Sequence, residues 1–311
     1  MLKNNIKYFS FLLLLVVIGC AKRGTIDGGS KDTIPPVMKM SFPKNFSTNF
    51  KDKKIELAFN EYVKLKNLEK ELIISPPMKR APEITPTSAS KSIIIEIKDT
   101  LRENTTYSLN FGKSIEDNNE GNPYHEFMYI FSTGTYIDSL TLNGKIKDSY
   151  DRQMATNLSL LLYEADSTFT DSIIYKENPR YITKTIDSAK VFQFNNLKEG
   201  KYFLIALKDE NRNNKFDPKS EKIAFRKQPI SIPSDSIFEM KLFKEVMKFQ
   251  AFSPRQVSGN RLTMGYQGNP KSIKINLKDR NETLPTIITK IDKKDSVEVW
   301  FKPLKIDSLK V

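Results

Sequence analysis

One stretch of the sequence carries oxygen-bearing side chains at the spacing of a cation-binding loop. A tight loop of this kind wraps a hard cation such as Ca²⁺ with ligands at positions 1, 3, 5 and 9 and with a backbone carbonyl at position 7. The sequence therefore predicts calcium as a candidate cofactor. The candidate ligands are Asp209, Asn211, Asn213, Lys215 through its backbone carbonyl, Asp217 and Glu221.

The same loop departs from the EF-hand pattern at two positions. Asn214 stands where the pattern has glycine, and position 12 is Ser220, with the carboxylate one residue later at Glu221. Arg212 and Lys215 also offset the negative charge, so we expect weak affinity, on the order of 10⁻⁴ to 10⁻³ M. The alternative is an Asx-rich loop that is held by its own backbone hydrogen bonds and binds no ion.

A second chemically distinct residue is Cys20, the only cysteine in the chain. It follows a basic segment with Lys3 and Lys7, an apolar run over residues 11–18 and the small residue Gly19, which is typical of a secretory signal peptide. The run is shorter than the roughly 20 residues needed to cross a bilayer. A lone cysteine cannot form an intramolecular disulfide, so the domains must be stable without one.

The residues Val17-Ile18-Gly19-Cys20 resemble the bacterial lipobox. The resemblance implies cleavage after residue 19 and a lipid, detectable with palmitate, on Cys20. The sequence therefore predicts a lipoprotein tethered to the cell outer membrane, with the membrane as a partner through this N-terminal lipid. The face of that membrane, periplasmic or external, is left open, as is an ordinary signal peptide with a chance cysteine.

Residue types for catalysis are scarce. The chain has a single histidine, His125, and a single cysteine, so catalysis by His dyads or thiols and sites with several histidines are excluded. Gly268-Asn269-Pro270 is typical of a turn, and there is no Gly-rich phosphate loop. Glu61 is expected at a sheet edge, and paired carboxylates for glycoside hydrolysis are not readable from sequence. We predict no catalytic residues and no enzymatic activity.

The net charge of +13 narrows the class of partner. The lysines are spread along the whole chain, and with the predicted export this argues against a nucleic-acid partner. An envelope protein or a glycan remains a candidate. Exposed aromatic rings aligned on one face would favour a glycan, although core or edge roles would explain the same residues. The candidate rings are Tyr124, Tyr150, Tyr163, Tyr175 and Tyr181.

A polar spacer follows the predicted anchor, and half-buried strands follow the spacer. Residues 20–34 contain the cysteine and a Gly- and Ser-rich stretch typical of a flexible linker. Beyond it apolar residues alternate with polar ones at Ile55, Leu57 and Phe59, and again at 93–97, 107–111 and 127–131. Only residues 65–72 could form a short helical turn. The pattern predicts an all-β fold built of tandem sandwiches.

Residues 35–134 contain several short motifs in order. They are Pro35-Pro36, Ser41-Phe42-Pro43, Asn60-Glu61-Tyr62, Asn104-Thr105-Thr106-Tyr107, Asp117 to Asn122 and Phe131-Ser132-Thr133-Gly134. These motifs resemble the SbsA-type bacterial Ig-like domain. The order of the motifs and the start of the mature chain also resemble Ig-like-domain lipoproteins of Bacteroidota. The resemblance implies a β-sandwich used as a spacer or interaction module.

Two further β-rich segments are predicted. Residues 138–245 contain alternating leucines at 158, 160 and 162 and a Leu-x-x-Gly-x-Tyr run at 197–202, and they resemble transthyretin-like or carboxypeptidase-regulatory-like sandwiches. Residues 246–311 contain predicted strands around Leu262, Ile273 with Ile275, Ile287 and Val297. Residues 309–311 are expected to lie inside another strand, which would make this third domain incomplete.

Two functional hypotheses follow. The first is a non-enzymatic, membrane-anchored lipoprotein that serves as a scaffold, stalk or interaction module of the bacterial envelope. The second is an accessory glycan-binding part of a larger enzyme or polysaccharide uptake system.

Overall fold

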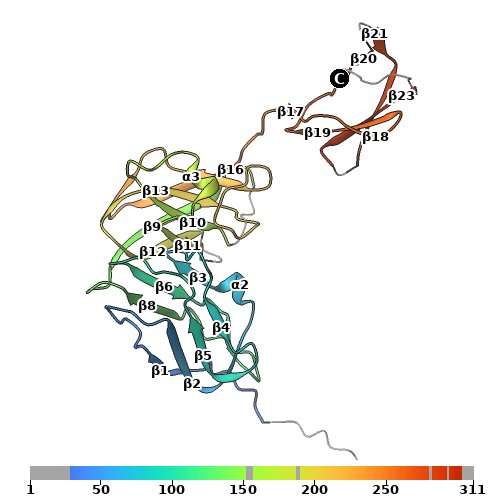
Figure 1. Cartoon of the computed structure of the whole chain (residues 1–311). Coiled ribbons are helices and arrows are strands. Elements are labelled where there is room, and N and C mark those ends of the chain that lie inside the picture. The colour runs from blue at the N-terminus through green and yellow to red at the C-terminus, as the bar shows by residue number, and fades with distance from the viewer. Residues whose placement is uncertain (1–28, 152–156, 187–189, 280–281, 293, 303–311) are drawn as a thin grey trace, which may run out of the picture.

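The computed structural model describes residues 29–151, 157–186, 190–279, 282–292 and 294–302. Its elements are strands except for two short helices, so the all-β prediction is confirmed. Three β-rich units follow one another along the chain, and Figure 1 shows the third joined to the second by a single chain segment. The predicted signal peptide, Cys20 and residues 309–311 lie outside the described residues.

The first unit is a sandwich of two sheets. One sheet has the order β1-β2-β5-β4, with β7 also paired to β2, and the other has the order β3-β6-β8. Alternate residues of the predicted strands, such as Leu57 and Leu109, meet in the core between the sheets. Its elements are β1 (Met38–Phe42), β2 (Lys54–Leu65), α2 (Leu68–Glu71), β3 (Ile73–Ser75), β4 (Glu83–Thr85), β5 (Ser90–Glu96), β6 (Thr106–Asn110), β7 (Ile115–Asp117) and β8 (Met128–Ser132).

The predicted turn after β7 is organised by the buried side chain of Asp117. Its carboxylate accepts backbone N–H bonds from Glu120 at 2.7 Å, Gly121 at 3.1 Å and Asn122 at 2.7 Å. Burial alone would raise the pKa of Asp117, but these N–H groups outweigh burial and hold the pKa below its usual value. The carboxylate therefore replaces the backbone partners that a regular strand would have supplied.

The second unit is also a sandwich, and its last strand belongs to both layers. The strand order is β11-β10-β13-β14-β16-β9-β12, with β15 paired to β13. β16 pairs antiparallel with β14 at Ile223 and parallel with β9 from Ile237 onward. Its elements are β9 (Leu140–Asp148), β10 (Ser159–Glu164), α3 (Ile173–Lys176), β11 (Tyr181–Lys184), β12 (Val191–Leu197), β13 (Gly200–Leu207), β14 (Lys222–Phe225), β15 (Ile230–Ile232) and β16 (Ile237–Lys244).

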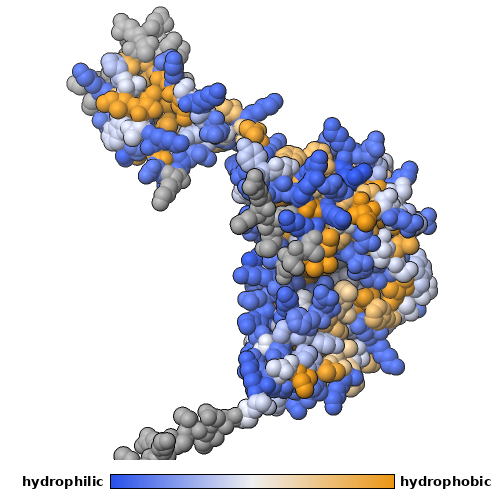
Figure 2. Space-filling model, turned by 180° about the vertical axis from the view of Figure 1, so that it is seen from behind, coloured by the Kyte–Doolittle hydropathy of each residue, from blue (hydrophilic) through white to orange (hydrophobic). Residues whose placement is uncertain are grey.

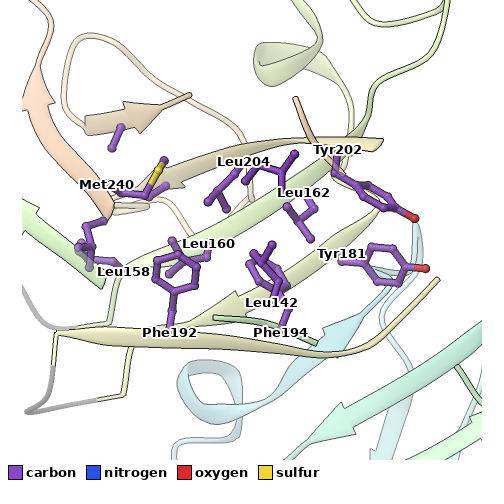
Figure 3. Close-up of a cluster of buried hydrophobic side chains, with 14 of the residues drawn as sticks. Leu142, Leu158, Leu160, Leu162, Tyr181, Phe192, Phe194, Tyr202, Leu204 and Met240 are labelled. Carbon is purple, nitrogen blue, oxygen red and sulfur yellow. The ribbon is translucent and has the colours of Figure 1, made fainter. Parts of the chain in front are cut away.

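The core of the second unit lies between these layers. Figure 3 shows Leu160, Leu162 and Leu204 facing Phe192 and Phe194 across the gap between the layers. Leu160 and Leu162 are the alternating residues that the sequence singled out, and both are fully buried. Alternation alone would leave the other face of β10 in water. Leu161 and Tyr163 on that face are nevertheless buried, because the chain around α3 and the 209–221 loop cover it.

The third unit is smaller. Its sheet has the order β17-β19-β23-β22, with β18 paired to β19, and β20 and β21 form a separate hairpin. The strand predicted at Ile273 and Ile275 is wrong, because the chain there is irregular although Ile275 is buried. Ile275 is thus buried by packing, although its backbone is not paired with a neighbouring strand. The strands are β17 (Gln250–Ala251), β18 (Arg255–Ser258), β19 (Arg261–Gln267), β20 (Leu277–Asp279), β21 (Glu282–Leu284), β22 (Thr286–Lys290) and β23 (Ser296–Phe301).

The first two units are joined through the edge strand β11. The backbone N–H of Ile182 in β11 donates to the Ser75 hydroxyl at the end of β3, at 3.1 Å. The Arg180 guanidinium donates to the Thr105 hydroxyl at 3.3 Å. Ile73 of the first unit also packs against the apolar cluster on the outer face of the second. The edge of the second sheet is thus covered by the first unit, which holds the two units together.

The connection between the units is fixed as well. Asp138, which lies between β8 and β9, is buried. The Thr106 hydroxyl donates to its carboxylate at 2.8 Å, and the Asn196 amide donates to its backbone carbonyl at 2.9 Å. Thr106 belongs to the first unit and Asn196 to the second, so Asp138 is held from both sides.

We predict that Ser75→Ala weakens this junction. The substitution leaves the Ile182 N–H without its acceptor, which costs about 1–3 kcal/mol when the group stays buried. Differential scanning calorimetry of the full chain should show a lower midpoint for the transition of the first two units. Ser231→Ala is the control, because Ser231 is exposed on β15. Identical traces for the two variants would contradict a coupling role for this contact.

Candidate functional site: an acidic loop and an aromatic groove

The predicted cation loop connects β13 to β14 and lies at the junction of the first two units. Asp209, Arg212 and Asn214 line a cleft of about 410 Å³, together with Lys70 and Ile73 of the first unit. Lys184 of β11 lines the same cleft, and its ammonium group donates to the Lys70 backbone carbonyl. Burial is the main reason why the pKa of Lys184 is lowered. The loop is therefore one wall of an inter-unit cleft.

Glu221 holds the loop from inside. Its side chain is fully buried, and its carboxylate accepts backbone N–H bonds from Glu210 at 3.0 Å and from Asp217 at 2.9 Å. Burial raises the pKa of the Glu221 carboxyl, the charge of Asp209 adds to this rise, and the backbone N–H groups oppose it. One carboxylate therefore binds backbone N–H groups from both sides of the loop and holds them together.

Asp209 and Asp217 turn their oxygens toward the loop's own donors. The Asp209 carboxylate accepts N–H bonds from Asn213 at 3.2 Å and from Asn214 at 2.8 Å. Asp217 accepts the N–H of Lys219 at 2.9 Å and the hydroxyl of Ser220 at 3.1 Å. These are the hydrogen bonds expected of an Asx-rich loop that is held by its own backbone and binds no ion.

Asn214 fits the position that the pattern reserves for glycine. It adopts φ 57°, in the left-handed region that asparagine tolerates better than most residues. Among the described residues, no group of three or more His, Cys, Asp or Glu side chains is placed to hold a metal ion. A carboxylate oxygen that accepts one N–H bond still has a second lone pair, which a cation could use. The calcium site, with Asn211 and the Lys215 carbonyl among its ligands, therefore stays a prediction.

A second candidate site is an apolar groove on the outer face of the second unit. Its volume is about 530 Å³, and its lining includes Tyr175 of α3, Phe203 and Phe216. At its open side Phe225 and Phe243 make an edge-to-face pair with ring centroids 5.9 Å apart. Charged groups of both signs, from Asp171, Arg226, Lys227 and Glu245, also line the groove. It thus combines exposed ring faces with hydrogen-bonding groups.

The five tyrosines chosen from the sequence do not form one aligned face. Tyr163 and Tyr181 are buried, and Tyr124 packs against the core of the first unit. Tyr150 is 95% exposed and lies outside the groove, whereas Tyr175 is 44% exposed and lines it. The remaining rings of the groove are phenylalanines, none of which was among the residues chosen from the sequence. One signal in the sequence could have indicated the groove. Strands β13 and β14 carry apolar residues, Phe203 and Phe225, on the face that is expected to point to solvent.

The other residues considered for chemistry lie apart from both sites. His125 is exposed in the loop before β8. Glu61 lies within β2, where the register with β5 shifts, and its carboxylate accepts a bond from the Asn60 amide at 3.2 Å. Neither residue faces the cleft or the groove.

The first unit has the fold of an Ig-like β-sandwich, and a family model agrees. Residues 32–133 match the family model of the bacterial Ig-like domain. No curated protein matches the chain. The structure is similar to the N-terminal part of the bacterial S-layer protein SbsC, with 13% identity, 65% of this chain and 42% of that chain covered, and a TM-score of 0.23.

Two further solved structures show similarity of the same order. A longer SbsC structure has 10% identity over 86% of this chain and 50% of its own, with a TM-score of 0.22. The major pilin subunit BcpA of Bacillus cereus has 11% identity over 67% of this chain and 70% of its own, with a TM-score of 0.21. The chain spans half or less of the S-layer structures, and at these scores the likeness carries no functional argument.

We predict that the 209–221 loop binds calcium weakly. The full chain with Cys20→Ala should release or absorb heat on calorimetric titration with CaCl₂, with a Kd on the order of 10⁻⁴ to 10⁻³ M. Asp209→Ala should abolish this signal, because it removes the carboxylate at position 1. Asp235→Ala, an exposed acidic residue elsewhere, should not change it. No heat and no shift in melting temperature at millimolar calcium would mean that the loop is held by its hydrogen bonds alone.

Proposed function

We propose that this chain is a non-enzymatic lipoprotein of the bacterial envelope, of the Bacteroidota type, that is anchored to the outer membrane through a lipid on Cys20. Its Ig-like unit and its second unit, which we assign to the transthyretin-like sandwiches, act together as a scaffold or interaction module. A single lipid chain gives only marginal binding, so two or three chains are expected on the cysteine.

The observation that carries the scaffold proposal is the covered edge between the first two units. β11 would otherwise offer open N–H groups to any passing strand. The Ser75 hydroxyl, the Arg180 contact and the buried Asp138 hold the two units as one body. A body of this kind suits a spacer that holds further parts of the chain at a set distance from a membrane.

The lipobox-like motif supports the anchor, and the bonding of the carboxylates supports the absence of catalysis. The Val17 to Cys20 motif ends a signal-like segment, and the sequence contains no other cysteine. Along the described ranges, no helix is long and apolar enough to cross a bilayer. The carboxylates of Asp117 and Asp209 accept backbone N–H bonds, as structural carboxylates do.

A second candidate function is glycan binding, and the aromatic groove favours it. Sugars stack on flat rings, and Tyr175 and Phe225 expose about half of their surface there, 44% and 50% respectively. Arg226 and Asp171 line the same groove and would bond to sugar hydroxyls. This site would make the second unit a binding platform carried by the same scaffold.

We predict that Cys20→Ala abolishes labelling by radioactive palmitate in cells and releases the protein from the membrane fraction. The lipid is expected to be bonded to the sulfur of Cys20, and no other cysteine is available to replace it. Ser30→Ala in the spacer is the control and should keep both the label and the fractionation. Unchanged labelling of the Cys20→Ala chain would refute the anchor.

We predict for the groove that the protein is retarded in native gels containing a soluble glycan such as laminarin or mannan. Tyr175→Ala and Phe225→Ala should each weaken this interaction by about tenfold or more, equal to about 1.4 kcal/mol. Tyr150→Ala is a matched control, because Tyr150 is exposed outside the groove. Equal retardation of all three variants would remove the groove as the glycan site.

A further inference from the structure

The N-terminal edge of the first unit exposes an unusual run of large apolar side chains. They are 52% to 68% exposed, and none is needed to complete the core described above. We call this set the apolar stripe. Its members are Ile34, Val37, Met40, Phe42 and Phe46.

The geometry of β1 explains why two of these side chains, Met40 and Phe42, face outward. The register between β1 and β2 shifts between Met38 and Met40. Met38 therefore packs against the core, whereas Met40 and Phe42 share the opposite face. Phe42 stands opposite the exposed Glu56, and Ser41 stands opposite the buried Leu57. The exposure of Met40 and Phe42 thus follows from the backbone register of β1.

Positive charge accompanies the stripe. Residues 31–54 contain six lysines against two aspartates. Two of the lysines, Lys39 and Lys44, alternate with the apolar residues of the stripe, and both are exposed. Apolar side chains interspersed with lysines are the composition of surfaces that lie on anionic lipid, where the chains enter the interface and the amines reach the headgroups.

The position of the stripe in the chain also points to a membrane. The described chain starts at Gly29, five residues before Ile34, and residues 1–28 precede it. Cys20 is fourteen residues before Ile34, and fourteen extended residues span at most about 50 Å. Figure 2 shows apolar residues on the end of the body where the described chain begins. The stripe is therefore within reach of the surface that holds the predicted lipid.

We propose that the apolar stripe docks the first unit onto an anionic phospholipid surface, so that the Ig-like unit lies against the membrane along β1. This proposal rests on the lipid anchor of the proposed function for its membrane. Addition of a partner strand is disfavoured at this edge, because β1 is short, is bulged at Lys39 and is followed by Pro43. Lipid contact needs no strand pairing and uses only the side chains and lysines described.

The test uses the full chain from residue 20 with Cys20→Ala, so that no lipid contributes. Sedimentation with vesicles of phosphatidylethanolamine and phosphatidylglycerol should carry the protein down at low salt, and phosphatidylcholine vesicles should carry much less. Raising the salt should weaken binding, because it screens the lysines. The triple variant Met40→Ser, Phe42→Ser, Phe46→Ser should lose about tenfold in vesicle affinity. Circular dichroism confirms that the variant is folded.

The matched control replaces three exposed apolar residues that lie elsewhere, Ile237→Ser, Val246→Ser and Phe249→Ser. It should bind the anionic vesicles as the parent does. Equal loss in both triple variants, or no binding by the parent, would overturn the proposal. A change in sedimentation-equilibrium mass in place of vesicle binding would mean that a second copy covers the stripe, and would overturn it too.

The two proposals fail separately. Absence of vesicle binding with normal palmitate labelling of Cys20 would overturn the docking stripe alone. Vesicle binding by the unlipidated chain, together with labelling that survives Cys20→Ala, would overturn the anchor alone.

Discussion

A strand at the edge of a sheet leaves a row of backbone N–H and C=O groups without partners, and this constraint decides how the first two units sit. β11 is such an edge strand. The first unit covers it with the Ser75 hydroxyl, which accepts a backbone N–H bond from β11, and with the apolar side chain of Ile73. The cleft depends on this contact, because α2 of the first unit and the 209–221 loop of the second unit line it from opposite units.

Buried carboxylates take the place of disulfides in holding the connections. Asp117 and Glu221 each collect several backbone N–H groups, and Asp148 accepts those of Tyr150 and Asp151 while pairing with Lys222 at 2.7 Å. The opposing effects of burial and of hydrogen bonding on the carboxyl pKa differ between these residues. Burial would raise the pKa of Asp148, but its N–H partners and Lys222 lower it, whereas burial prevails at Glu221. A chain with one cysteine thus orders its loops electrostatically.

Period-two alternation was enough to predict the all-β class and the core faces of strands such as β2 and β10, because a strand in one layer of a two-layer sandwich buries every second residue. It failed where burial depends on distant segments. Leu161 and Tyr163 are buried by a loop that alternation does not report, and Ile275 is buried without joining a strand. For the same reason a tyrosine list could not find the groove, which Phe203, Phe216 and Phe225 build from separate elements.

The parallel pairing of β9 with β16 has a mechanical consequence. β9 is the first strand of the second unit and β16 its last, and their residues are paired in parallel from Ile237 with Asn143 to Leu242 with Asp148. Tension between the two ends of this unit therefore pulls the strands past each other along their length. All the hydrogen bonds of the ladder then carry the load together, whereas a hairpin pulled from its open end would lose them one at a time. The first unit repeats the arrangement on a smaller scale, where Ser47 meets Phe131 in a parallel bridge.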